Sequence, residues 1–139
     1  MVVNSISPAS STGRSSIRRI AREDMEHLIP QAEKDYMLFG IKGAEYYAYY
    51  LDGKLVGFAG LKVYPSYLKI LNDYVVPEHR GKGIYRKLFS IRWNDIISMP
   101  QRRIKTIATA MSERMFLSYG FKVTRVHSKT KEMIYDKDW

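Results

Sequence analysis

The stretch Val75 to Leu88 reads VVPEHRGKGIYRKL and combines three kinds of local structure. It begins with β-branched valines, which suit a strand, and the strand should end at Pro77 because proline has no N–H to donate to a sheet. Gly81 and Gly83 follow in a basic loop, and apolar residues then recur at helical spacing. The stretch therefore predicts a strand, a glycine loop and a helix N-terminus in direct succession.

Such a loop is suited to hold an anion. Glycine lets backbone N–H groups approach a ligand closely, and a helix N-terminus adds donors and the positive end of the helix dipole. The spacing fits neither GxGxxG nor GxxxxGK[ST], which disfavours a dinucleotide site or a P-loop. A pyrophosphate group suits this geometry. The alternative interpretation is that the two glycines only allow a tight turn and bind no ligand.

Positive charge is concentrated around this stretch. The whole chain has a net charge of +9, and the segment from Arg80 to Lys105 has eight basic residues and one acid, a local charge of +7. The basic residues are Arg80, Lys82, Arg86, Lys87, Arg92, Arg102, Arg103 and Lys105. This positive charge has three interpretations: a binding surface for a phosphate-rich small molecule, a nucleic-acid-binding surface, or a solvated helix face. The first of the three is favoured.

Length and composition restrict the class of protein. With 139 residues and 45% hydrophobic content, the chain can bury one core. The absence of cysteine excludes disulfides, thiolate metal sites and cysteine nucleophiles. His27 and His127 are too isolated for a metal site, so we expect no metal. No apolar run is long enough for a membrane span or a signal peptide, so we expect a cytoplasmic protein without a membrane partner.

The remaining sequence predicts a flexible tail over residues 1–16, which are rich in serine, and a single domain over residues 17–139. Helices are predicted from Glu23 to Ile29, from Ile84 to Ile97, and after Ser112 as far as Gly120. Seven strands are predicted: Ile17–Ile20, Tyr46–Leu51, Leu55–Val63, Tyr67–Val76, Ile104–Ala108, Phe121–Val126 and Glu132–Tyr135. The Asp52-Gly53-Lys54 sequence predicts a hairpin turn between two of these strands.

The segment Arg80-Gly-Lys-Gly-Ile84 resembles the R/Q-x-x-G-x-G/A loop of the GCN5-related N-acetyltransferase (GNAT) superfamily, which holds the pyrophosphate of acetyl-coenzyme A. Three flanking strings strengthen the resemblance, which covers about residues 17 to 135: Tyr49–Ala59, Tyr74–His79 and Met115–Phe121. Tyr85 stands where the family has a small residue, which should alter the packing of the loop. The resemblance implies an α+β fold with a mixed, mostly antiparallel sheet of six to seven strands and helices on both faces.

The resemblance also implies where the cofactor binds. The main chain of Asp73 to Val75 should bind the pantetheine arm, and the Val75 N–H should face the developing oxyanion, where such a donor contributes about 3 kcal/mol. The implied cofactor-binding residues are Tyr74, Val75, Arg80, Gly81, Lys82, Gly83, Ile84, Tyr85, Arg86 and Ser112. For Ser112, a helix cap is the alternative.

The catalytic residues are less directly implied. An acceptor amine must lose its proton before attack, at a cost of roughly 4 to 5 kcal/mol near pH 7, and Asp73 is the candidate base. Its alternative role is a structural one, bonded to a neighbouring strand or paired with Lys69 or Arg80. The family often uses a tyrosine as the acid, but Phe116 stands at that position. Tyr119 is the nearest hydroxyl and the candidate acid, with packing or cofactor contact as its alternative.

The resemblance therefore implies an N-acetyltransferase, an acyltransferase that moves the acetyl group of acetyl-coenzyme A to a primary amine by direct attack. The acceptor stays open between a small molecule and a protein amine, and the net charge favours acidic or neutral acceptors over polyamines. A basic nucleic-acid-binding module and a catalytically inactive coenzyme A-binding protein are the alternatives. The oligomeric state stays open, a homodimer included.

Overall fold

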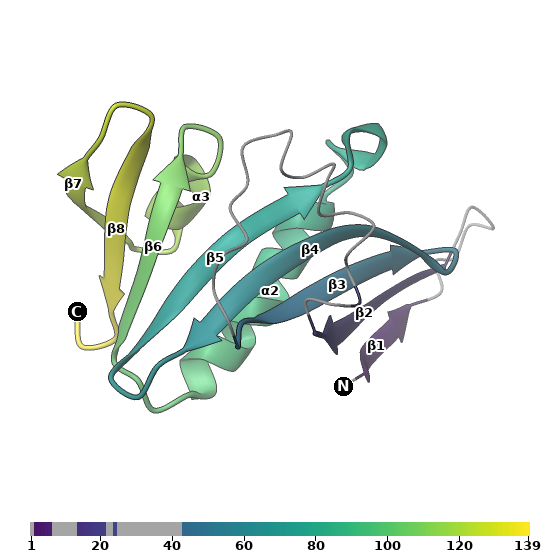
Figure 1. Cartoon of the computed structure of the whole chain (residues 1–139), viewed down its shortest axis with the longest axis horizontal. Helices are drawn as coiled ribbons and strands as arrows, with labels where there is room; N and C mark the ends of the chain where they lie inside the picture. The colour runs from purple at the N-terminus through teal and green to yellow at the C-terminus, as the bar shows by residue number, and fades with distance from the viewer. Residues whose placement is uncertain (1, 7–13, 22–23, 25–42) are drawn as a thin grey trace. The chain divides into compact units, whose positions relative to one another are not determined.

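The computed structural model describes residues 2–6, 14–21, 24 and 43–139 (Figure 1). The chain forms two compact units, the first made of Met1–Leu61 and Asn72–Ser98 and the second of Lys62–Leu71 and Met99–Trp139, and each is described by itself. Eight strands are hydrogen-bonded in the order β1-β2-β3-β4-β5-β6-β8-β7. The predicted mixed, mostly antiparallel sheet is confirmed, and the described residues contain eight strands instead of the six to seven predicted.

The first unit contains antiparallel pairs of β1 with β2, β2 with β3, and β3 with β4. Their bounds are Val2–Ile6 for β1, Ser15–Ile20 for β2, Glu45–Leu51 for β3 and Lys54–Val63 for β4. Strand β1 lies in the segment for which the sequence predicts a flexible tail. Its sequence, VVNSI, suits a strand, and pairing with β2 supplies the partner that composition alone does not reveal.

The turn between β3 and β4 has the backbone conformation that its sequence predicts. Asp52 and Gly53 have φ values of 52° and 78°, and both central residues of a type I′ hairpin turn require positive φ. The turn sets the register of the hairpin, in which Leu51 lies opposite Lys54. The predicted hairpin is therefore confirmed.

Strand β5 spans Tyr67–Val75, and the 3₁₀ helix η2, Pro77–His79, and helix α2, Ile84–Ser98, follow it. In the first unit, α2 packs on β3 (Figure 1). The buried side chains of α2 form a stripe at helical spacing. The stripe consists of Ile84, Leu88, Phe89, Arg92 and Ile96. Four of these residues are apolar, in line with the helical spacing that the sequence shows, whereas Arg92 is a charged residue in the same stripe.

The second unit contains β6, Arg103–Thr109, which pairs in parallel with the first residues of β5, from Tyr67 opposite Arg103 to Ile70 opposite Thr106. Strand β8, Thr130–Asp136, pairs antiparallel with both β6 and β7, Lys122–Val126. Helix α3, Glu113–Ser118, packs on β6. Gly120 follows α3 with a φ of 96°, the left-handed position predicted for it.

The helix predicted from Glu23 to Ile29 lies outside the described residues, apart from Asp24. In the part of the chain that the structure describes, no helix is both long and apolar enough to cross a membrane.

Candidate functional site

The glycine loop joins η2 to α2 in the first unit. Gly81 and Gly83 have φ values of 79° and 80°, a region that other residues rarely adopt. A Cβ atom added at either glycine would meet no atom within 4 Å, so backbone conformation, and not crowding, favours glycine at both positions. The first helical hydrogen bond joins the Lys87 N–H to the Gly83 oxygen, which places the amides of the preceding turn at the N-terminus of a 15-residue helix.

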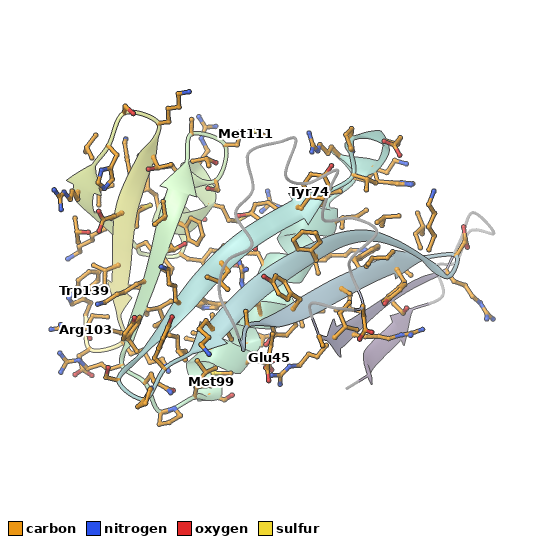
Figure 2. The ribbon with its side chains drawn as sticks, viewed as in Figure 1. Glu45, Tyr74, Met99, Arg103, Met111 and Trp139 are labelled. Atoms are coloured by element: carbon orange, nitrogen blue, oxygen red, sulfur yellow. The ribbon has the colours of Figure 1, made fainter. Side chains whose placement is uncertain are left out.

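Arg80 connects this loop to the end of β5. Its Nε donates a hydrogen bond to the Val75 oxygen at 2.7 Å, and its guanidinium lies 5.3 Å from the centroid of the Tyr74 ring. Figure 2 shows Tyr74 near the carboxyl end of β5. The predicted cofactor-binding residues on the strand and on the loop are therefore brought together by a direct contact.

Four cations surround the loop, and all are exposed: Arg80, Lys82, Arg86 and Lys87. The Lys82 Nζ lies 3.2 Å from the His79 Nδ1. Tyr85, the departure from the family pattern, is half-buried, and its ring packs edge-to-face against Phe89 at 6.0 Å. The larger side chain is thus accommodated on α2 itself, one helical turn before Phe89, while the loop backbone keeps its positive φ angles.

Asp73, the candidate base, is bound by a residue that was not among the predicted partners. Arg92 donates from Nη1 and Nη2 to the two carboxylate oxygens at 2.5 and 2.9 Å. The partner is therefore neither Lys69 nor Arg80, the two predicted from sequence, because the helical stripe of α2 carries Arg92 to this side of β5. The Asp73 side chain is 10% exposed and that of Arg92 is 0% exposed.

A second polar contact crosses the same layer. The Tyr47 hydroxyl on β3 donates to Asp95 on α2 at 2.6 Å, and the Tyr47 side chain is buried. Burial, followed by this hydrogen bond to a carboxylate, raises the pKa of Tyr47 above its usual value. Asp95 follows Arg92 by three residues, so one face of α2 supplies both polar contacts.

The other predicted residues lie in the second unit. Phe116 is buried and packs edge-to-face on Phe121 at 5.1 Å, so it is a core residue. Tyr119 follows α3 and is half-buried. Ser112 precedes α3 as predicted, but its hydroxyl does not cap the helix. Its Oγ accepts the Thr109 N–H at 3.0 Å instead, because its backbone is already helical.

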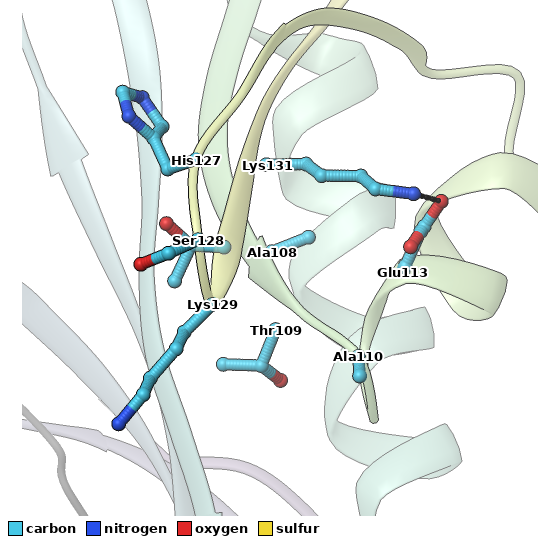
Figure 3. Close-up of a pocket in the computed structure, with 9 residues that line it drawn as sticks. Ala108, Thr109, Ala110, Glu113, His127, Ser128, Lys129 and Lys131 are labelled. Carbon is cyan, nitrogen blue, oxygen red and sulfur yellow. Dashed lines mark hydrogen bonds and ion pairs between the residues drawn. The ribbon is translucent and has the colours of Figure 1, made fainter.

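An open pocket of about 470 Å³ lies in the second unit, where the end of β6 meets the β7–β8 turn (Figure 3). Two polar side-chain contacts lie near this turn. Lys131 donates to Glu113 at 2.8 Å, and the hydrogen bond between His127 and Glu132, at 2.5 Å, lowers the pKa of the Glu132 carboxyl. Lys129 extends from the turn (Figure 3).

Sequence reasoning missed two residues of the first unit. Arg92 is one helical turn from both Leu88 and Ile96, and this i±4 spacing was a signal that it lies on the buried face. Gly57 was missed as well. A Cβ atom there would lie 3.0 Å from the Tyr74 backbone oxygen, a contact between strands that no local sequence signal reports.

Comparison with known proteins agrees with this arrangement. The model of the acetyltransferase (GNAT) family matches residues 14–91, more than half of the chain and all of the glycine loop. No curated protein sequence matches the chain significantly.

Several solved structures share the fold. The PaiA N-acetyltransferase from Thermoplasma acidophilum, in complex with coenzyme A, has a TM-score of 0.67 at 18% identity, over 88% of this chain and 98% of that one. NAA60 from Arabidopsis thaliana, with a bisubstrate analogue, has a TM-score of 0.68 at 16% identity, over 88% and 97%. N-acetylglutamate synthase from Neisseria gonorrhoeae, with coenzyme A and N-acetyl-glutamate, has a TM-score of 0.70 at 18% identity, over 88% of this chain and 35% of that one.

Proposed function

Because the chain belongs to the acetyltransferase (GNAT) family, we propose that it is an N-acetyltransferase that uses acetyl-coenzyme A and a primary amine. The observation that carries the proposal is the loop of Gly81 and Gly83, whose positive φ angles present backbone amides at the N-terminus of α2. Exposed cations flank that loop. The donor set fits a pyrophosphate, since backbone N–H groups, guanidinium groups and ammonium groups are the donors that bind phosphate oxygens.

In this proposal, the phosphates are held by the loop residues Arg80, Gly81, Lys82 and Gly83. The first turn of α2 completes the phosphate site with Ile84, Tyr85 and Arg86. The main chain of Asp73 to Val75 holds the pantetheine arm, and the Val75 N–H polarises the carbonyl that is attacked. When bound, acetyl-coenzyme A supplies an acetyl group on a thioester.

Two residues of the proposal move protons. Tyr119 gives its hydroxyl proton to the departing sulfur, and the acceptor amine loses a proton before attack. Asp73 is the proposed base for that proton, although both of its carboxylate oxygens accept hydrogen bonds from Arg92. Ser112 contacts the pantetheine arm in this scheme.

The acceptor in the proposal is a primary amine of neutral or acidic character. The structural relatives include an N-acetylglutamate synthase complexed with N-acetyl-glutamate, which supports an amino acid as one candidate acceptor. A protein amine is the other candidate. The net charge of +9 would attract acidic acceptors and repel polyamines.

The second candidate function is coenzyme A binding without transfer. The buried position of Phe116 favours it, because the residue at the family's tyrosine position has no hydroxyl and is packed in a core. Turnover of any amine distinguishes the two functions.

Calorimetric titration with acetyl-coenzyme A tests the binding step. We expect the wild type to bind and Gly83→Glu to weaken binding at least about a hundredfold, because the new carboxylate repels the phosphates. Gly53→Glu is the matched control: Gly53 has a φ of 78° and equally open surroundings, but it lies in the β3–β4 turn. Equal weakening by both variants, or no binding by the wild type, would contradict the proposal.

Transfer is measured by the release of the coenzyme A thiol. The chain has no cysteine, so a colorimetric thiol reagent reports the product without a background from the protein. The acceptors are L-glutamate, L-lysine, spermidine and a short peptide with a free N-terminus and a lysine. Turnover that requires an amine supports the transferase, and binding without turnover supports the second candidate.

A further inference from the structure

Arg92 is a buried cation in the layer between α2 and the strands of the first unit. Its side chain is fully buried, and Leu88 and Ile96, one helical turn away on either side, are fully buried too. A charge in such surroundings persists only when it is paired and hydrogen-bonded. Arg92 has both kinds of contact, because Nη1 and Nη2 bind the Asp73 carboxylate and Nη1 also donates to the Gly60 oxygen at 3.1 Å.

These contacts join three elements. Asp73 belongs to β5, Gly60 to β4 and Arg92 to α2, so one guanidinium fixes the helix against two strands. The planar guanidinium gives the contact a direction as well as an energy, since two parallel N–H groups meet two carboxylate oxygens.

The same short segment of β5 is held at one more point, because Arg80 from the loop donates to the Val75 oxygen. Between the two held residues, the Tyr74 oxygen lies so close to β4 that a Cβ atom at Gly57 would be 3.0 Å from it. Asp73 and Val75 are thus held by two different arginines, and glycine at position 57 leaves room for the backbone between them. This is the segment to which the proposed function assigns the pantetheine arm and the carbonyl that is attacked.

Stability alone does not require an ion pair here. Apolar residues of similar volume commonly replace buried ion pairs without loss of stability, whereas removal of one partner is strongly destabilising. An apolar pair would fill the space between α2 and β5, but it would lack the directional hydrogen bonds that join Arg92 to position 73 of the strand. A displacement of about 1 Å at a reacting group lowers a rate about a hundredfold.

We propose that Arg92 is a positioning residue for acyl transfer, which acts by holding Asp73 and thereby the end of β5. The inference rests on the proposed function. It assigns Asp73 a part in orienting its own strand, whether or not its carboxylate also takes a proton.

Arg92→Lys tests the inference and leaves Asp73 intact. A lysine keeps the charge, but one ammonium cannot bind both carboxylate oxygens and the Gly60 oxygen in the same geometry. We expect kcat for the amine found in the acceptor screen to fall about tenfold, with the Kd of acetyl-coenzyme A changed less than about twofold. Arg18→Lys, an exposed arginine on β2, is the matched control and should keep the wild-type kcat.

The double variant Asp73→Leu/Arg92→Met tests whether lost stability explains a lower kcat. It also removes the proposed base, so Arg92→Lys, which keeps Asp73, is the variant that isolates positioning. We expect the urea midpoint of the double variant to stay within about 0.5 M of the wild type, because the buried charges leave together. Its kcat should stay at least about tenfold below the wild type. A purely structural pair would instead restore kcat together with stability.

The outcomes separate this inference from the proposed function. If the wild type transfers acetyl groups and Arg92→Lys matches its kcat, the positioning role is overturned and the proposed function stands. Wild-type kcat in the double variant would also overturn it. If the wild type transfers acetyl to no amine in the screen, the transferase and the positioning role are overturned together, while binding by calorimetry still reports on the cofactor site.

Discussion

The Nε of Arg80 donates a hydrogen bond to the backbone oxygen of Val75 at 2.7 Å, which joins the glycine loop to the strand that precedes it. The guanidinium group is planar and rigid, so a hydrogen bond from its Nε to the Val75 oxygen restrains the orientation of the whole group. The loop and the strand end, two parts of the proposed cofactor site, are therefore positioned together.

Arg80→Lys should weaken the binding of coenzyme A about tenfold, which corresponds to about 1.4 kcal/mol. A lysine can bind either the Val75 oxygen or a phosphate, but not both in a fixed geometry. Calorimetric titration measures the change. Arg114→Lys, which replaces an exposed arginine on α3, serves as the control, and an equal loss of affinity in both variants would argue against the contact.

Gly57→Ala should destabilise the protein by about 1–3 kcal/mol, the usual cost of overpacking. The new Cβ would lie 3.0 Å from the Tyr74 backbone oxygen and 3.3 Å from a methyl group of Val75, so the end of β5 must shift. Urea unfolding measures the loss. Ser90→Ala, at an exposed position of α2, should stay within about 0.5 kcal/mol of the wild type. If Gly57→Ala is as stable as that control, the end of β5 can shift without a measurable cost in free energy, which would contradict the prediction.

Tyr47 should make the stability of the protein depend on alkaline pH. Burial raises the pKa of Tyr47 in the folded state, so above about pH 10 the unfolded chain loses a proton that the folded chain keeps. Stability is therefore lost as the pH rises, at up to about 1.4 kcal/mol per pH unit for this group. Tyr47→Phe should show a shallower fall between about pH 10 and pH 11 in urea unfolding, while the two proteins keep a constant difference below about pH 9. Identical slopes would contradict the raised pKa.

Tyr119→Phe should lower kcat about a hundredfold or more if its hydroxyl is the proton donor, because a positioned general acid contributes at least that factor. The ring is retained, so the melting temperature should change little. The Kd of acetyl-coenzyme A distinguishes the alternatives: weaker binding at unchanged kcat would assign the hydroxyl to cofactor contact, and no change in either would assign Tyr119 to packing.

Local features of the fold were predictable from sequence. The Asp52-Gly53 turn, the break at Pro77 and the glycine loop depend on backbone φ preferences that belong to single residues, and the structure has them where the sequence places them. The spacing of apolar residues likewise predicted α2 to within a residue. The resemblance to the GNAT superfamily, confirmed by the family match, came from the same local strings.

Contacts between distant residues were decided by the tertiary structure. Asp73 and Arg92 are 19 residues apart, and the choice of Arg92 over Lys69 or Arg80 as the partner depends on which face α2 turns toward β5. The strand β1 exists because β2 supplies an antiparallel partner to residues whose composition suggests a tail.

The sequence by itself determined where the chain turns, where α2 begins and which backbone amides could meet a phosphate, because these depend on φ angles and spacing within a few residues. Only the tertiary structure decided that Arg92, Arg80 and Gly57 come together at the last three residues of β5. A hydrogen bond depends on the distance and direction between two atoms in space, and a linear order of residues does not contain that information.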